Sequence, residues 1–171
     1  MSKLLNHTLS NRRHILGERK RYQVDVLWTG NSGSGTAIYR GYERSHLVQV
    51  QGKPVIYGSA DPAFRGDATK YNPEELLVAS LSSCHMLWYL HLCAEAGIIV
   101  MEYIDHAMGT LIETQDGSGY LEEVVLKPTV KVSNIDMVNL AKELHQTANK
   151  KCFIANSVNF PVRHQADIQV I

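Results

Sequence analysis

The sequence predicts one α+β domain in which short strands surround a long apolar helix. An apolar run with clear helix-start and helix-stop signals lies near the middle of the chain, and strand-like segments lie on both sides of it. The order of strands, helix, hairpin, helix and strand favours helices packed on one face of a sheet. A chain of 171 residues is long enough to bury a core without metal or disulfide cross-links.

The part of the chain before the helix predicts three strands and two loops. Residues 22–28 (YQVDVLW) alternate and are rich in strand-forming residues, and residues 36–50 (TAIYRGYERSHLVQV) predict a second strand. Between them, residues 30–35 (GNSGSG) predict a flexible turn and not a phosphate loop, because the Lys-Ser/Thr ending and the following helix are both missing. A short strand is expected after Lys53-Pro54, followed by a long polar loop over residues 58–72.

The central helix is expected to begin after Asn72 and to end before Gly97. Asn72 is a good N-cap, Pro73 suits the first helical position, and the two acidic residues that follow favour the positive end of the helix dipole. The apolar run continues to Ala96, where the glycine supplies the stop signal.

The second half of the chain predicts a hairpin, a helix and a final strand. Residues 100–114 and 120–132 predict two long strands joined by the turn DGSG at residues 116–119. Residues 136–150 predict a helix with one apolar face, formed by Met137, Ala141, Leu144 and Ala148. Residues 162–171 alternate and predict the last strand.

Charge and composition exclude several classes of protein. Seventeen basic and seventeen acidic residues cancel, so the overall charge indicates neither a nucleic-acid partner nor a membrane partner. Three cysteines, an odd number in a chain with no recognisable export signal, favour a reducing compartment, and we expect a cytoplasmic protein. Residues 1–21 form a basic N-terminal segment that fits a solvated helix or tail, or an organelle-targeting peptide, and residues 22–171 are expected to form the single domain.

The three cysteines differ in their predicted surroundings. Cys84 and Cys93 lie nine residues apart on the central helix, which at about 100° per residue places them on opposite faces; Cys93 is therefore expected in the core. Cys84, Trp88 and His91 share a face, but Trp88 occupies the position that a bridging ligand would need, so we expect no metal site and no cofactor. Cys152 follows the second helix beside two lysines, a setting that favours thiolate formation.

Two segments resemble a known family. YNPEELLVASLSSC, which ends at Cys84, resembles the helix of the OsmC/Ohr family, the osmotically induced and organic hydroperoxide resistance proteins, in its Asn-Pro-Glu start and in the cysteine ten residues after the glutamate. KCFIANSV resembles the second cysteine segment of the family, and its Cys152 lies 68 positions after Cys84. The element order matches over about residues 22–171. The resemblance implies the OsmC-like fold, with antiparallel sheets, a long central apolar helix and an intertwined homodimer.

The resemblance also implies an activity, that of a thiol peroxidase which reduces organic hydroperoxides to alcohols. Cys84 matches the peroxidatic cysteine, which becomes a sulfenic acid, and Cys152 matches the resolving cysteine, which joins it in a disulfide. A dithiol reductant, in the family a lipoylated protein, would restore both thiols. The alternative is a homodimeric small-molecule binding or stress protein of the same fold without efficient peroxidase turnover.

The resemblance assigns a glutamate and an arginine to the thiolate. Glu74 matches the glutamate that orients the arginine, but the early glycine turn, where the family carries that arginine, contains none. Arg44 is the preferred candidate, ahead of Arg40 and Arg65. Glu74 lies about 15 Å from Cys84 along one unbroken helix, so we expect it to serve a second subunit. His85 also departs from the family pattern, and it either favours the Cys84 thiolate by its charge or faces elsewhere.

Overall fold

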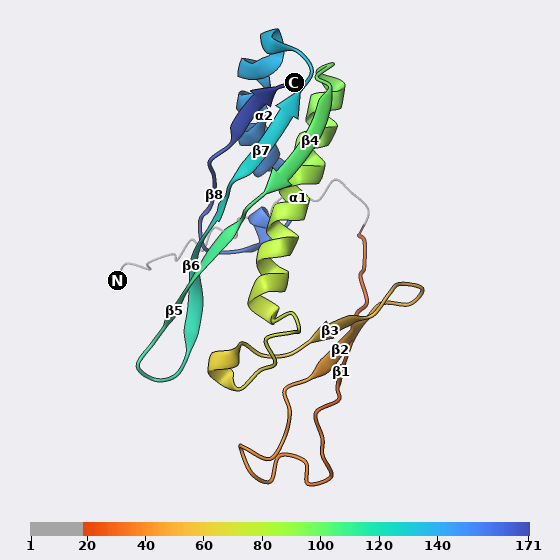
Figure 1. The fold of residues 1–171 in the computed structure, drawn as a ribbon, viewed down its shortest axis with the longest axis vertical. Coiled ribbons are helices and arrows are strands. Elements are labelled where there is room, and N and C mark those ends of the chain that lie inside the picture. The colour runs from red at the N-terminus through yellow and green to blue at the C-terminus, as the bar shows by residue number, and fades with distance from the viewer. Residues whose placement is uncertain (1–18) are drawn as a thin grey trace, which may run out of the picture.

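The computed structural model describes residues 19–171 and has the predicted α+β class (Figure 1). Its two long helices are α1 (Pro73–Glu95) and α2 (Val138–Lys151). The strands form three small sheets, with the orders β1-β2-β3, β4-β7-β9 and β5-β6-β8. The predicted basic segment lies outside the described residues except for its last three, 19–21, which are exposed and belong to no helix or strand.

The strands are β1 (Asp25–Trp28), β2 (His46–Gln49), β3 (Ile56–Gly58), β4 (Val100–Asp105), β5 (Met108–Glu113), β6 (Gly119–Leu126), β7 (Pro128–Val132), β8 (Val162–His164) and β9 (Asp167–Val170).

Helix α1 begins and ends where its capping residues predict. The Asn72 side chain accepts a hydrogen bond from the backbone N–H of Glu75 at 2.7 Å, and the Glu75 carboxylate accepts one from the Asn72 N–H at 3.0 Å, which completes a capping box. Gly97 adopts a φ of +72°, which favours glycine just past the helix end. By length and composition α1 could cross a membrane, but it packs against strands and against α2 as the core helix of a folded domain.

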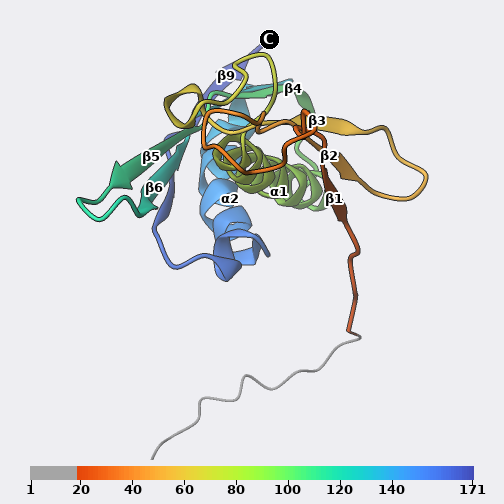
Figure 2. The same ribbon diagram turned by 90° about the horizontal axis from the view of Figure 1, so that it is seen from below.

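The core forms two clusters that follow one another along the buried face of α1. In one cluster, Tyr89 and Cys93 pack with residues of α2 and of the β4-β7-β9 sheet; in the other, Leu81 packs with Val124 and Leu126 of β6. Figure 2 shows α1 and α2 side by side in the middle of the molecule. The two helices thus pack together against the β4-β7-β9 and β5-β6-β8 sheets, as the order of elements predicts.

The long strands predicted around the hairpin are each divided in two. Residues 100–114 form β4 and β5, and residues 120–132 form β6 and β7, so that β4 pairs with β7 and β5 pairs with β6. The break falls at Pro128, which has no N–H to donate. The preceding Lys127 N–H donates to the side-chain Oδ1 of Asp105 at 2.7 Å and not to the backbone carbonyl of a neighbouring strand. The predicted turn between β5 and β6 is present, with Gly117 at φ +82°.

The last predicted strand is also divided, and this changes the sheets. Residues 162–171 form β8 and β9, which pair in parallel with β6 and β7 respectively. Two of the sheets are therefore mixed: the expected antiparallel pairing holds for the other strand pairs, and these two pairs are parallel.

The strand predicted over residues 36–50 is shorter than expected. Only β2 is a strand, and the preceding residues form turns, one of them closed by a hydrogen bond from Gly41 N–H to the carbonyl of Ile38 at 2.8 Å. The Arg44 guanidinium donates to the backbone carbonyls of Tyr39 and Tyr42, which holds the segment curled. Arg40 and Arg44 therefore lie in this curled segment and not in a strand.

The β1-β2-β3 sheet lies beyond the N-terminal end of α1, away from the other two sheets (Figure 1). Large apolar side chains on this sheet are exposed, namely Val26, Leu27, Trp28, Ile56 and Tyr57. So many exposed apolar side chains on one small sheet are typical of a protein–protein interface.

Candidate active site

The structure brings Cys84 and Cys152 together. Cys84 lies in the middle of α1, and Cys152 is the C-cap residue of α2, where its N–H donates to the carbonyl of Ala148 at 2.9 Å. Both thiols are free and share a hydrogen bond. Cys84 is half-buried, whereas only 1% of Cys152 is exposed, so Cys84 is the thiol that a molecule from solvent can reach.

The surroundings of Cys152 differ from the cationic setting that the sequence predicts. Burial raises the pKa of the Cys152 thiol to about 11, and the hydrogen bond shared with Cys84 acts in the same direction. The Ala155 N–H, 3.4 Å from Cys152 Sγ, opposes this effect without overcoming it. The neighbouring Lys151 turns instead toward Trp88, with Nζ 5.1 Å from the ring centre. The expectation that Cys152 forms a thiolate easily is therefore wrong, because desolvation dominates.

Cys84 opens into an apolar hollow of about 530 Å³. The hollow is lined by Ser80, Ser83, Cys84, Leu87, Trp88, His91, Phe153 and Ile154. Trp88 and Phe153 meet edge to face, with ring centres 5.6 Å apart, and form one wall. The predicted shared face of Cys84, Trp88 and His91 is thus confirmed, and no arginine occurs among the described residues that line the hollow.

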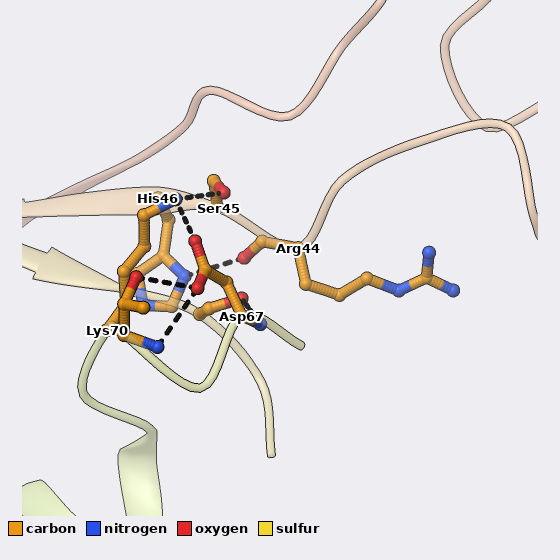
Figure 3. Close-up of polar contacts among 7 residues, drawn as sticks. Arg44, Ser45, His46, Asp67 and Lys70 are labelled. Atoms are coloured by element: carbon orange, nitrogen blue, oxygen red, sulfur yellow. Dashed lines mark hydrogen bonds and ion pairs between the residues drawn. The ribbon is translucent and has the colours of Figure 1, made fainter. Parts of the chain in front are cut away.

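Glu74 and Arg44 line a different hollow, of about 460 Å³. The Arg44 guanidinium lies over the rings of Tyr39 and Tyr42, at 4.6 and 4.1 Å from their centres. Figure 3 shows that it points away from the ion pair of Asp67 and Lys70, while the Arg44 carbonyl accepts a hydrogen bond from His46 Nδ1 at 3.1 Å. This arginine is thus oriented by its own loop.

The other two candidate arginines are placed outside both hollows. Arg40 lies in an exposed turn, and Arg65 is exposed with a left-handed φ of 66° just after a short 3₁₀ turn. The described lining of the Cys84 hollow and of the Glu74 hollow contains neither residue.

One chain therefore holds the predicted site residues in two separate pairs. Cys84 and Cys152 form one pair, and Glu74 and Arg44 form the other. Helix α1 is unbroken over its 23 residues, so Glu74, in its first turn, lies about 15 Å along the axis from Cys84. The two pairs do not meet within one chain.

The structure reveals a histidine cluster that sequence reasoning did not find. His85 of α1 and His145 of α2 are fully buried, and His85 Nε2 shares a hydrogen bond of 2.9 Å with His145 Nδ1. His164 of β8 lies against both rings at 5.7 and 5.8 Å. Burial lowers the pKa of His85 to about 4 and that of His145 to about 3, and the neighbouring imidazoles add to this effect. His85 therefore faces away from the thiolate as a neutral core residue. The sequence signal that could have indicated this cluster is the position of His145, two turns before Cys152 on the same helix.

Cys93 is a core residue, as predicted. Only 1% of it is exposed, it packs beside Tyr89, and burial raises the pKa of its thiol.

Comparisons with known proteins place the chain in a family. The family model described as OsmC-like protein matches residues 66–167. An OsmC-like protein of unknown function from Vibrio cholerae has a similar structure, with a TM-score of 0.78 and 30% sequence identity over 86% of this chain and 99% of that one. A search of curated proteins found no match.

More distant structures share the fold. An organic hydroperoxide resistance protein from Elizabethkingia anophelis matches with a TM-score of 0.61 and 18% identity, over 90% of this chain and 100% of that one. A putative organic hydroperoxide resistance protein from Vibrio cholerae, with captopril bound in one of its active sites, matches with a TM-score of 0.58 and 19% identity, over 88% and 93% of the two chains. The family model and the Vibrio cholerae relative of unknown function together show that this chain belongs to the OsmC-like protein family.

Proposed function

We propose that this protein is a cysteine-based peroxidase that reduces organic hydroperoxides to alcohols. The observation that carries the proposal is the contact between two free thiols, one of them open to an apolar hollow and the other buried. A reachable thiol beside a protected one suits a peroxidatic and a resolving cysteine. An odd number of cysteines favours a reducing compartment, which we propose to be the cytoplasm.

The reaction follows from the difference between the two thiols. The Cys84 thiolate attacks a peroxide oxygen, so that an S–O bond forms, the O–O bond breaks and the alkoxide leaves to take a proton from water. Cys84 is oxidised to a sulfenic acid, and the peroxide is reduced to the alcohol. The Cys152 thiol then attacks this sulfur; the S–S bond forms, the S–O bond breaks, and the Cys152 proton leaves with the hydroxide as water. The raised pKa of Cys152 keeps that proton in place until this step. A dithiol, as in a lipoylated protein, restores both thiols by exchange.

The lining of the hollow favours a peroxide with an apolar tail. Leu87, Trp88 and Phe153 offer aliphatic and aromatic contacts next to Cys84. Each methylene that leaves water contributes about 0.8 kcal/mol, so three such groups are worth roughly fiftyfold in efficiency. The similar proteins named for organic hydroperoxide resistance accord with this substrate class.

We further propose a homodimer in which Glu74 and Arg44 of one subunit serve Cys84 of the other. The distance along α1 separates Glu74 from its own Cys84, and the exposed apolar side chains of the β1-β2-β3 sheet supply a surface for a second copy. The oriented Arg44 guanidinium then supplies the arginine that the described lining of the Cys84 hollow does not contain.

The decisive experiment adds one equivalent of cumene hydroperoxide to the reduced protein and measures its mass. The proposal predicts a loss of two hydrogen atoms and a Cys84–Cys152 link in the peptide map. Cys84→Ser should consume no peroxide, whereas Cys152→Ser should consume one equivalent and stop as a sulfenic acid. Cys93→Ser is the matched control, since Cys93 lies in the core, and it should behave as the wild type. An unmodified mass would favour the binding or stress protein instead.

A second experiment tests the shared site. The inactive Glu74→Gln and Cys84→Ser proteins are unfolded and refolded together. If Glu74 acts on the other subunit, the mixed dimer contains one site with both defects and one intact site, so activity returns. The proposal of a shared site is wrong if mixed dimers form and no activity appears.

A further inference from the structure

Two direct contacts join α1 to α2 at neighbouring positions. Cys84 meets Cys152, and His85, the next residue of α1, meets His145, which lies two turns before Cys152 on α2. One contact is between thiols and the other between imidazoles. Any change in the spacing of the two helices at this level therefore affects both contacts.

The imidazole pair is satisfied only in part. Whichever ring donates the shared proton, one N–H and one nitrogen lone pair remain at the outer ends. Both His85 Nδ1 and His145 Nε2 are buried without a hydrogen-bond partner among residues 19–171. Within the described part of the chain, the Tyr103 hydroxyl is also buried without a partner, whereas the Tyr89 hydroxyl lies beside the Cys93 thiol. If either ring takes up an additional proton, the N–H group that forms has no hydrogen-bond acceptor among the described residues.

The described aromatic side chains around the pair carry no negative charge. Tyr89 of α1 stacks on His145 with ring centres 3.8 Å apart, Tyr103 of β4 lies 6.5 Å from it, and His164 of β8 lies against both rings. No carboxylate is among the described groups that shift the pKa of either histidine. A proton added to the pair is therefore a buried, uncompensated charge, which is costly.

We propose that His85 and His145 are positioning residues for the Cys84–Cys152 disulfide: the neutral pair holds α1 and α2 at the spacing at which the two thiols join, and a proton on the pair loosens that contact. The lowered pKa values of both histidines accord with this role. The inference deepens the proposed function, on which it rests for the use of the disulfide in turnover.

Linkage makes the coupling reciprocal. If protonation of the pair disfavours the disulfide, the disulfide must disfavour protonation of the pair by the same factor. Because both rings already have lowered pKa values in the folded, reduced protein, the stability of the disulfide should fall as the pH approaches the pKa of His85, about 4. This fall has to disappear when the pair can no longer take up a proton.

The test uses the full chain in mixtures of reduced and oxidised glutathione without oxygen, so it needs no peroxidase activity. At about pH 7.5 and about pH 3.5, on either side of the lowered pKa of about 4 of His85, the fraction with the Cys84–Cys152 disulfide is measured by mass spectrometry after acid quenching. In H85Q/H145N, an amide N–H and an amide oxygen replace the two bonded nitrogens, so the hydrogen bond can remain while the titratable rings are gone. His106→Gln, in the loop between β4 and β5, is the matched control.

The wild type and His106→Gln should lose about fourfold in the glutathione equilibrium constant between the two pH values, because the reduced pair takes up a proton that the oxidised pair does not. H85Q/H145N should change by less than about twofold. An equal fall in all three proteins would overturn the proposal. If H85Q/H145N does not fold, the test is made on the wild type alone. The NMR resonances of His85 and His145 should then titrate at lower pH in the oxidised protein than in the reduced protein. Titration at the same pH in both forms would overturn the proposal. A protein that passes these tests but consumes no peroxide would disprove the proposed function and leave this coupling standing.

Discussion

Acid should destabilise this protein in a pH range where carboxylates do not yet titrate. In the folded state His85 and His145 have pKa values of about 4 and about 3, against an ordinary value of 6.5. The unfolded chain therefore binds protons at a higher pH than the folded chain does. The stability is full above pH 6.5 and is lost as the pH falls from 6.5 toward the folded values.

The size of the effect follows from the two pKa values. Each buried histidine costs up to about 1.4 kcal/mol per pH unit below its unfolded pKa. Between about pH 7 and about pH 5, this amounts to roughly 2 kcal/mol for each histidine and roughly 4 kcal/mol for the pair. The lowered pKa values of Asp67 and Asp116 act in the same direction only around and below 3.8, the ordinary value for aspartate. The pH range above 5 thus isolates the histidines.

The assay is urea unfolding of the reduced protein at fixed concentration, followed by circular dichroism at several pH values. The free energy of unfolding should fall by roughly 4 kcal/mol in the wild type and in His106→Gln between about pH 7 and about pH 5. H85Q/H145N should keep most of its stability over this range, apart from the contribution of His164, whose pKa is also lowered by burial. Identical pH slopes in wild type and H85Q/H145N would refute the reasoning.

Three further substitutions test how α1 is held, each measured by urea unfolding at neutral pH. Leu81→Ala removes a fully buried side chain between α1 and β6 and should cost about 2–5 kcal/mol, whereas a loss below about 1 kcal/mol would contradict this packing. Gly109→Ala places a Cβ 2.7 Å from the Val78 side chain, so it should cost about 1–3 kcal/mol by overpacking. An unchanged stability would show that the β5-β6 hairpin shifts to accommodate the added methyl group without cost. Asn72→Ala removes the capping box and should cost about 1 kcal/mol; the conservative Asn72→Asp should retain most of it.

The local signals in the sequence predict the helices well. The ends of α1 follow from Asn72 and Gly97, because capping groups and a left-handed glycine act within a few residues of the chain. The core position of Cys93 and the shared face of Cys84 and Trp88 follow from helical periodicity alone.

The strand pairing and the charge environment depend on contacts far apart in the sequence. Nothing local distinguishes β4 from β5, because the break between them depends on which distant strand each one joins. The strand pattern of residues 36–50 is overridden by the bonds of the Arg44 side chain to carbonyls of its own loop. The setting of Cys152 could not be predicted either, since its burial comes from packing against Cys84 on the other helix.

The histidine pair could not be predicted from local signals either. His145 takes a buried position on the face of α2 between Ala141 and Ala148, where a polar residue breaks the apolar pattern. Only its tertiary partner, His85, explains why it is there.

The parallel pairing of β8 and β9 has a consequence for how the chain is made. Both strands come after α2, yet each completes a different sheet, on β6 and on β7. During synthesis on the ribosome, neither sheet can be completed until the segment beyond residue 161 has emerged. Until then, the apolar face of α1 is only partly covered by its packing partners. A nascent chain that carries such a long apolar helix is a natural client for chaperones that hold hydrophobic segments until translation has passed this point.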